Sequence, residues 1–467
     1  MLFSSLTFVF VFLPITVVLY FLAKEKYKNA ILLVASLIFY AWGEPKYIFL
    51  MLSSIVANFF IARMIDKNRR GTKQKKLWLC FAVVLNIGAL FVFKYLDFTV
   101  NNVNVVFGTD MNLPGLNLPI GISFYTFQIL SYVIDVYRNR VRVQNDIFTL
   151  GTYIALFPQL IAGPIVRYAD IEVQLKHRKH SLEKFCSGLR RFLLGFLKKV
   201  LVANNVAVIA DSVFDNLGGN GLNVGVVLLA LMAYTLQIYY DFSGYSDMAI
   251  GLGRIFGFDF MENFNYPYSA KSVTDFWRRW HISLTTWFRD YLYIPLGGNR
   301  CSKLKWTRNF LIVWLCTGLW HGASWNFIIW GLYYAVVLWL EKMWFGKMLK
   351  KLPSIVGWVY MFIIVNFGWL LFRLESVSDL RIVLQSLVSP SGDFVGFLSN
   401  NFSIVYHLIF MIIGFIFIFP IRRKMQGFAN KHTLVAALSD IMIIVFFVVS
   451  IFSLINSSYN PFIYFRF

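Results

Sequence analysis

The run that decides the fold class is NFLIVWLCTGLWHGASWNFIIWGLYYAVVLWLE, residues 309–341. Its roughly 33 residues would form ~50 Å of α-helix, whereas one membrane crossing needs only ~30 Å. The same run is too short for two full crossings joined by a turn. Gly318 and Gly322 lie near its middle, beside His321. The sequence therefore predicts a broken helix or a short buried hairpin, with its break near His321.

The composition of the whole chain is also that of a membrane protein. Of 467 residues, 58% are hydrophobic, 19% aromatic and only 14% charged, whereas soluble proteins carry ~25% charged residues. A soluble multidomain protein, a disordered chain, collagen and a coiled coil are thereby excluded. We expect an all-α polytopic protein with about 10–12 transmembrane helices in contact with the lipid bilayer.

No repeat and no low-complexity linker divides the chain, so residues 1–467 are predicted to form one membrane domain. The N-terminal run has no basic start and no small-residue cleavage site, and we interpret it as a retained first helix. The candidate crossings are 3–23, 29–43, 47–65, 77–98, 118–136, 192–215, 222–243, 309–341, 354–373, 404–420 and 434–455.

The net charge of +21 would suggest nucleic acid in a soluble protein. Here the basic residues cluster in short segments between apolar runs, so the positive-inside rule explains them better and no nucleic-acid partner is expected. Segment 66–76 is accordingly predicted to be cytoplasmic. The apolar run 147–165 contains Pro158 and Pro164 and has basic segments on both sides. A re-entrant hairpin lining a cavity fits that pattern, whereas a full crossing would violate the rule.

Residues 273–293, VTDFWRRWHISLTTWFRDYLY, have the pattern of one amphipathic helix. We expect it to lie at the interface or to pack against the bundle. The side chains predicted to share its apolar face are Trp277, Trp280, His281, Leu284, Trp287, Phe288 and Tyr291.

Two histidines are candidates for chemistry. His321 lies deep in an apolar run, where ionisable residues are costly and usually functional, although one hydrogen bond between helices would also explain it. A buried imidazole stays neutral near pH 7 and can take a proton from a hydroxyl. His281 lies on the apolar face of the predicted amphipathic helix, and its position slightly favours a packed core residue over a functional one. Asp241 and Asp247 are predicted to lie at the end of a helix, where plain solvation is the simpler interpretation.

The sequence lacks the motifs of several common enzyme classes. There is no GxSxG elbow, HExxH or Walker A motif. The four cysteines form no CxxC pair and no zinc-spaced cluster, so we expect no metal site and no disulfide scaffold.

Residues 276–300, FWRRWHISLTTWFRDYLYIPLGGNR, resemble the signature of membrane-bound O-acyltransferases (MBOAT), in the branch of bacterial polysaccharide O-acetylases typified by alginate O-acetylase. The resemblance extends over most of the chain, with its core motif region at about 119–341. The further matching segments are 119–138, 157–168, 239–258, 318–331 and 460–467.

The resemblance implies an MBOAT fold with re-entrant or broken helices around a central buried cavity. It implies that His321 is the family's catalytic histidine and that His281 occupies the second histidine position. Contacts with the substrates are expected from a further set of residues, although the arginines equally suit ordinary membrane anchoring. This set comprises Asp241, Asp247, Trp320, Arg278 and Arg279.

The implied chemistry is transfer of an acyl group, most simply acetyl, from a thioester to a hydroxyl. Acetyl-CoA or another acyl thioester would be the cytoplasmic donor substrate, with no permanently bound cofactor. A polysaccharide outside the bacterial plasma membrane would be the acceptor. Because the longest outer stretch is only about 30 residues, near 374–403, we expect an extracytoplasmic esterase-like acyltransferase as partner protein.

Three other functions stay open. The related D-alanyl transferases of teichoic acid modification share WRRWH, although residues 296–299 (LGGN) favour acetyl transfer. A transporter or flippase also uses broken helices with buried polar groups, but the chain contains no pair of matching halves. A passive scaffold of a secretion complex is the third alternative.

Overall fold

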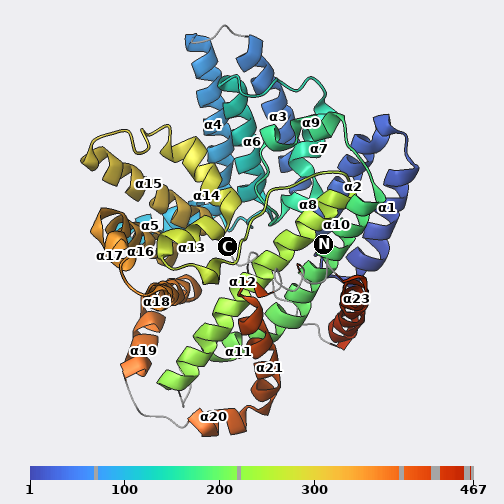
Figure 1. Ribbon diagram of the computed structural model, residues 1–467. Helices are drawn as coiled ribbons and strands as arrows, with labels where there is room; N and C mark the ends of the chain where they lie inside the picture. Colours follow the sequence, from blue (N-terminus) through green and yellow to red (C-terminus); the bar gives the residue numbers. More distant parts are fainter. Residues whose placement is uncertain are drawn as a thin grey trace. The chain divides into compact units, whose positions relative to one another are not determined.

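The computed structural model describes residues 1–67, 72–217, 222–388, 394–421, 427, 432–456 and 463. Every regular element among these residues is a helix (Figure 1). Within the described ranges, seven helices are long and apolar enough to cross a membrane, so the all-α polytopic prediction is confirmed, while the number of about 10–12 crossings stays a prediction. They are Ile48–Lys67, Lys73–Lys94, Leu182–Phe214, Val224–Ile255, Trp325–Leu349, Ser354–Arg373 and Thr433–Asn456.

The chain forms two compact units, each built from two separate stretches of sequence. Unit 1 comprises Met1–Phe192 and Ser246–Met261, and unit 2 comprises Leu193–Tyr245 and Glu262–Phe467. That residues 1–467 form one membrane domain stays a prediction.

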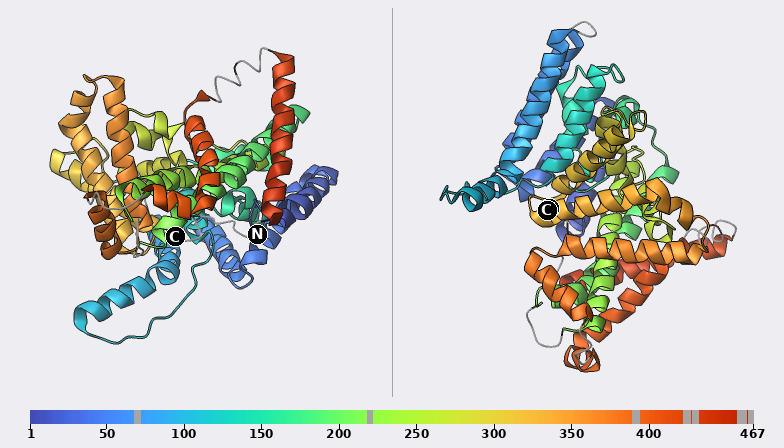
Figure 2. Two further views of the ribbon diagram at one scale, coloured as in Figure 1. Left: turned by 90° about the horizontal axis from the view of Figure 1, so that it is seen from below. Right: turned by 90° about the vertical axis from the view of Figure 1, so that its left-hand side faces the viewer.

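Unit 1 contains helices α1 to α9 and the first part of α10. Within it α3, α4 and α6 pack side by side (Figures 1 and 2). The buried amides of Asn58 on α3 and Asn86 on α4 exchange hydrogen bonds of 2.8 and 3.1 Å, a type of contact that links helices where lipid offers no partner. The bounds are α1 Leu13–Leu22, α2 Lys28–Gly43, α3 Ile48–Lys67, α4 Lys73–Lys94, α5 Leu96–Phe107, α6 Ile122–Tyr137, α7 Ile147–Ala155, α8 Phe157–Leu160, α9 Tyr168–Lys176 and α10 Leu182–Leu197.

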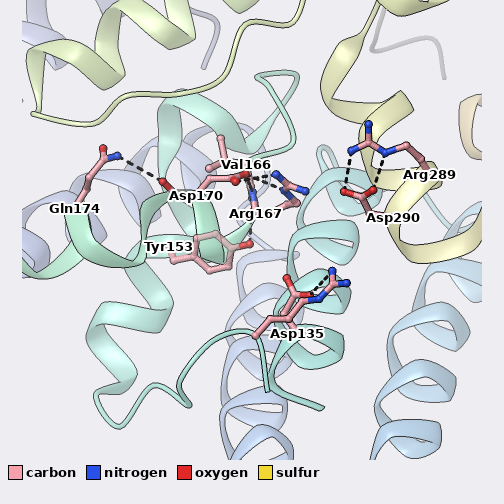
Figure 3. Close-up of polar contacts among 9 residues, drawn as sticks. Asp135, Tyr153, Val166, Arg167, Asp170, Gln174, Arg289 and Asp290 are labelled. Carbon is pink, nitrogen blue, oxygen red and sulfur yellow. Dashed lines mark hydrogen bonds and ion pairs between the residues drawn. The ribbon is translucent and has the colours of Figure 1, made fainter. Parts of the chain in front are cut away.

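The proline-containing run 147–165 is not one helix. It forms α7, α8 and an irregular stretch; α7 has nine residues, which is about 14 Å and too short to cross a bilayer. Side chains of the protein form hydrogen bonds with backbone carbonyl groups in and beside the irregular stretch. The hydroxyl of Tyr153 donates to the carbonyl of Val166 at 3.1 Å (Figure 3), and Gln159 donates to the carbonyl of Tyr153 at 2.6 Å. Nearly all of this stretch is buried, as irregular backbone at membrane depth requires. The re-entrant topology itself stays a prediction.

Unit 2 contains the remaining helices, with α12 contributing its last turns to unit 1. Their bounds are α11 Asn204–Phe214, α12 Val224–Ile255, α13 Val273–Arg279, α14 Ile282–Phe288, α15 Lys303–His321, α16 Trp325–Leu340, α17 Gly346–Leu349, α18 Ser354–Arg373, α19 Val377–Val388, α20 Phe394–Asn400, α21 Phe402–Phe417 and α23 Thr433–Asn456. Three π-helical segments extend or join them: η3 Lys198–Ala203, η5 Arg289–Tyr293 and η6 Glu341–Phe345.

The 309–341 run forms a helical hairpin, and its break lies where the sequence predicted. Helix α15 ends at His321, Gly322 and Ser324 are extended, and α16 begins at Trp325. Both arms are longer than the apolar run suggested, because α15 begins at Lys303 and α16 continues through η6.

Glycines allow the two arms of this hairpin to approach closely. A Cβ at Gly318 would lie 2.3 Å from the carbonyl oxygen of Phe327, and one at Gly331 would lie 2.5 Å from that of Trp314. The pair of small residues thus replaces side-chain contact by backbone contact, as is common between membrane helices.

Helix α12 is longer than the predicted crossing 222–243. It continues to Ile255, so Asp241 and Asp247 lie inside a helix and the prediction that they end one is wrong. The serines and glycines after Asp241 are compatible with helix because they pack closely on a neighbour. In unit 2, a Cβ at Gly244 would lie 2.8 Å from the carbonyl oxygen of Gly195 on α10.

Candidate functional site

The predicted amphipathic helix 273–293 is interrupted at its centre. Helix α13 ends at Arg279, His281 adopts the left-handed conformation (φ 44°, ψ 53°), and α14 begins at Ile282. The prediction of a single helix here is therefore wrong. The seven side chains expected on one apolar face are nevertheless all buried, so the periodicity correctly identified the residues that face the core.

Asn263 holds this interruption in place; it lies in the loop between α12 and the short 3-10 helix η4 (Pro267–Ser269). Its backbone carbonyl accepts from the N–H of Ile282 at 3.0 Å. Its side-chain Oδ1 accepts from the N–H of Ser283 at 3.1 Å and from the Ser283 hydroxyl at 2.9 Å. Oδ1 also lies 3.2 Å from Nδ1 of His281. These contacts compensate for the left-handed histidine, a conformation that is uncommon outside glycine.

The loop that carries Asn263 is itself anchored through Tyr268. The indole of Trp369 donates to the hydroxyl of Tyr268 at 2.9 Å. The indole of Trp358 donates to the backbone carbonyl of Tyr268, also at 2.9 Å. Tyr268 also donates to the carbonyl of Thr235 on α12 at 3.3 Å. The loop is thus fixed to α12 and α18, which gives Asn263 a defined position.

His321, the other candidate, ends α15 at the turn of the hairpin and is 6% exposed. Its ring packs edge-to-face against Trp330 at 5.1 Å and Phe372 at 5.2 Å between ring centroids. Its ring is also 5.0 Å from that of Trp320. Aromatic groups from α15, α16 and α18 therefore surround the imidazole.

The structure brings both predicted histidines to the same aromatic residue. The ring of Trp320 lies 5.8 Å from that of His281 and 5.0 Å from that of His321. The ring of His281 also lies 4.6 Å from that of Phe242 on α12. Two buried imidazoles near one indole, in low-dielectric surroundings, are suited to accept protons from bound hydroxyl groups.

His281 lies outside the helices that are long enough to cross a membrane. Burial lowers the pKa of His281 to about 3, because a charged imidazolium would lose its hydration. The side chain is therefore neutral at physiological pH.

The two predicted aspartates are both paired, and they lie in different units. In unit 2, Asp241 forms a buried ion pair with Lys199, with Nζ and Oδ1 2.6 Å apart. Its Oδ2 accepts from the N–H of Ile463 at 2.8 Å. In unit 1, Asp247 pairs with Arg191 at 2.7 Å. Both carboxylates therefore have a structural role, while their contact with substrate stays a prediction.

The two predicted arginines differ in their surroundings. Arg278 is exposed, whereas Arg279 is half-buried and pairs with Asp275 one turn earlier at 3.0 Å. Arg278 is therefore the better placed of the two to meet a phosphate in solution.

Sequence reasoning missed Asn263 and Glu341. Glu341 is buried, and its two carboxylate oxygens accept from the N–H groups of Val273 and Thr274, each at 2.8 Å. It therefore links η6, which follows α16, to the start of α13, which leads to His281. The sequence did offer an indication, because Glu341 is the lone acidic residue of the apolar run 309–341 and ends it.

We expect Glu341→Ala to lower the free energy of unfolding by about 1–3 kcal/mol, because the buried N–H of Val273 would lose its acceptor. Thermal unfolding in detergent measures this loss, with Glu375→Ala, an exposed acidic residue, as the matched control. Equal stability of Glu341→Ala and the control would contradict the anchoring role.

Residues 37–374 match the MBOAT, membrane-bound O-acyltransferase family. The "probable alginate O-acetylase" of Azotobacter vinelandii is 44% identical over 381 residues, 81% of this chain and 76% of the relative. The peptidoglycan O-acetyltransferase of Helicobacter pylori is 36% identical over 427 residues, 84% of this chain and 80% of the relative. The teichoic acid D-alanyltransferase of Bacillus subtilis is 29% identical over 325 residues, which cover 63% of this chain and 77% of the relative.

Proposed function

Because the chain belongs to the membrane-bound O-acyltransferase family, we propose that it moves an acetyl group from a thioester to a hydroxyl of a cell-surface polysaccharide. The family and the seven apolar helices make it a multi-pass bacterial membrane protein and an O-acyltransferase. Acetyl is supported over D-alanyl by the higher identity to the two O-acetylating relatives than to the D-alanyltransferase.

The observation that carries this proposal is the pair of buried histidines whose rings both lie near that of Trp320. In the proposed reaction, His321 takes the proton from the attacking hydroxyl as its oxygen bonds to the thioester carbonyl carbon. The tetrahedral intermediate then expels the thiolate, and the imidazolium returns the proton to sulfur. The products are an ester and a free thiol, with His321 restored.

The donor is proposed to be cytoplasmic, since acyl thioesters such as acetyl-CoA are made there. Arg278 is exposed and carries a fixed positive charge, which suits the phosphates of CoA or of a carrier's phosphopantetheine. Arg279 would contribute less, because Asp275 already neutralises it.

The acceptor is proposed to be a polysaccharide or peptidoglycan outside the membrane, as the names of the two O-acetylating relatives suggest. Between α18 and α21 the described residues form two short helices, α19 and α20, which is little surface for binding a polymer. An extracytoplasmic esterase-like partner that takes over the acetyl group remains part of the proposal.

Proteoliposomes with the protein in one orientation test this proposal. Radiolabelled acetyl-CoA is supplied on the cytoplasmic face only, with the polymer and partner on the other face. We expect label to reach the outer face with the wild type and not with His321→Ala. Label that stays on the donor side would contradict transfer across the membrane. Passage of intact donor without thioester cleavage would indicate a transporter instead.

A further inference from the structure

We propose that Asn263 is a positioning residue for acyl transfer: its side-chain oxygen fixes His281 in the tautomer whose Nε2 accepts a hydrogen bond from a hydroxyl of the bound acceptor other than the one that attacks. The inference deepens the proposed function and rests on it. It implies that His281 accepts a hydrogen bond from the substrate and does not donate one, a question that the sequence left open.

The orientation of the Asn263 amide follows from its neighbours. A backbone N–H can only donate, and the N–H of Ser283 lies 3.1 Å from the amide atom assigned as Oδ1. That atom must therefore be oxygen and not nitrogen. The hydroxyl of Ser283 lies 2.9 Å from Oδ1 and 3.5 Å from Nδ1 of His281, so Oδ1 is the nearer acceptor for its proton.

The tautomer of His281 then follows from the amide. Oδ1 can only accept, and Nδ1 of His281 lies 3.2 Å from it, so Nδ1 carries the hydrogen. A neutral imidazole has one N–H, and Nε2 is left with a lone pair. Among the residues that the structure describes, no hydrogen-bond partner of Nε2 is present, although the side chain is only 1% exposed.

This arrangement restricts what His281 can do. In the neutral state Nε2 cannot donate to a developing oxyanion, but it can accept from a hydroxyl. A buried acceptor without a partner is costly to maintain, so a substrate hydroxyl would gain by binding there.

No nearby charge complicates this assignment. Burial alone accounts for the lowered pKa of His281, and no charged group in the described parts of the chain contributes. Asp241, on the α12 helix that packs against His281, is neutralised by Lys199. His321, on α15, is the other titratable group near Trp320.

A purely structural role for Asn263 is the competing explanation, because its contacts also cap α14. Aspartate would cap that helix as well as asparagine does, since both offer an oxygen to Ser283. The variant Asn263→Asp therefore preserves the cap and places a carboxylate against Nδ1–H. A carboxylate stabilises the imidazolium and raises the pKa of His281.

The first test is the pH dependence of kcat/KM for acetyl transfer in the full-length protein. For Asn263→Asp we expect the acid limb to move to higher pH by at least about one unit, because the reactive form of His281 is unprotonated. For Asn263→Ala we expect kcat to fall roughly 10–100-fold with little change in the KM for the donor, the range expected when a bound reactant is misplaced. The control is Asn265→Asp, the same chemical change at an exposed residue of the same loop. In a His281→Ala background, neither Asn263 variant should change the remaining rate.

The second test does not depend on activity. Nitrogen-15 NMR of histidine-labelled protein in nanodiscs, assigned with His281→Gln, reports which ring nitrogen is protonated. We expect Nδ1–H for the wild type and a mixture of tautomers for Asn263→Ala. An Nε2–H signal in the wild type would overturn the inference, as would an unchanged acid limb in folded Asn263→Asp. A fixed Nδ1–H tautomer in a protein that transfers no acetyl group would instead count against the proposed function.

Discussion

Replacing His321 by alanine should reduce acetyl transfer about 10²–10⁴-fold, the usual effect of removing a general base. The imidazole is 6% exposed and enclosed by Trp320, Trp330 and Phe372, so water has little room to replace it as base. His321→Gln keeps much of the shape of the side chain but should fail equally, since an amide does not take up the proton. Steady-state release of free thiol from acetyl-CoA, with acceptor present, measures both variants.

The matched control is His407→Gln, which makes the same change in the same unit. His407 is half-buried on α21, and its Nδ1 lies 2.9 Å from the side-chain oxygen of Asn205. We expect its rate to stay close to that of the wild type. Wild-type activity of a folded His321→Ala protein, or equal losses at the two positions, would exclude His321 as the base.

Sequence reasoning succeeded where the cause of the structure is local. The break near His321 follows from the length of one apolar run and from Gly318 and Gly322 inside it. The irregular path of 147–165 follows from Pro158 and Pro164. In each case, the residues that decide the backbone lie within the segment that they shape.

Sequence reasoning failed where the deciding residue lies elsewhere in the chain. Nothing in WRRWHISL marks a left-handed histidine, because Asn263, eighteen residues earlier, supplies the compensating hydrogen bonds. The helical continuation after Asp241 likewise depends on Gly195 of another helix, which packs against Gly244. Serine, glycine and tyrosine in sequence resemble a helix end, and only the packing partner makes them helical.

The largest stability effect is expected at the ion pair of Lys199 and Asp241. Both side chains are only 3% exposed, and removing one partner of a buried pair typically costs about 3–5 kcal/mol because the other charge stays buried alone. We expect Lys199→Met to lose about that much stability, measured by thermal unfolding in detergent. Lys347→Met, at an exposed lysine, should change little.

The double variant Lys199→Met/Asp241→Asn separates stability from function. With both charges gone, more than half of the lost stability should return, because no uncompensated charge remains. The asparagine oxygen can still accept from the N–H of Ile463, as Asp241 does at 2.8 Å. If that protein is stable and active, Asp241 serves the fold and the predicted contact with substrate is wrong. If it is stable yet inactive, the carboxylate or the lysine takes part in binding or transfer. If the double variant is no more stable than Lys199→Met, the attraction between the two charges holds α12 and η3 together, and the cost of one unpaired buried charge does not explain the loss.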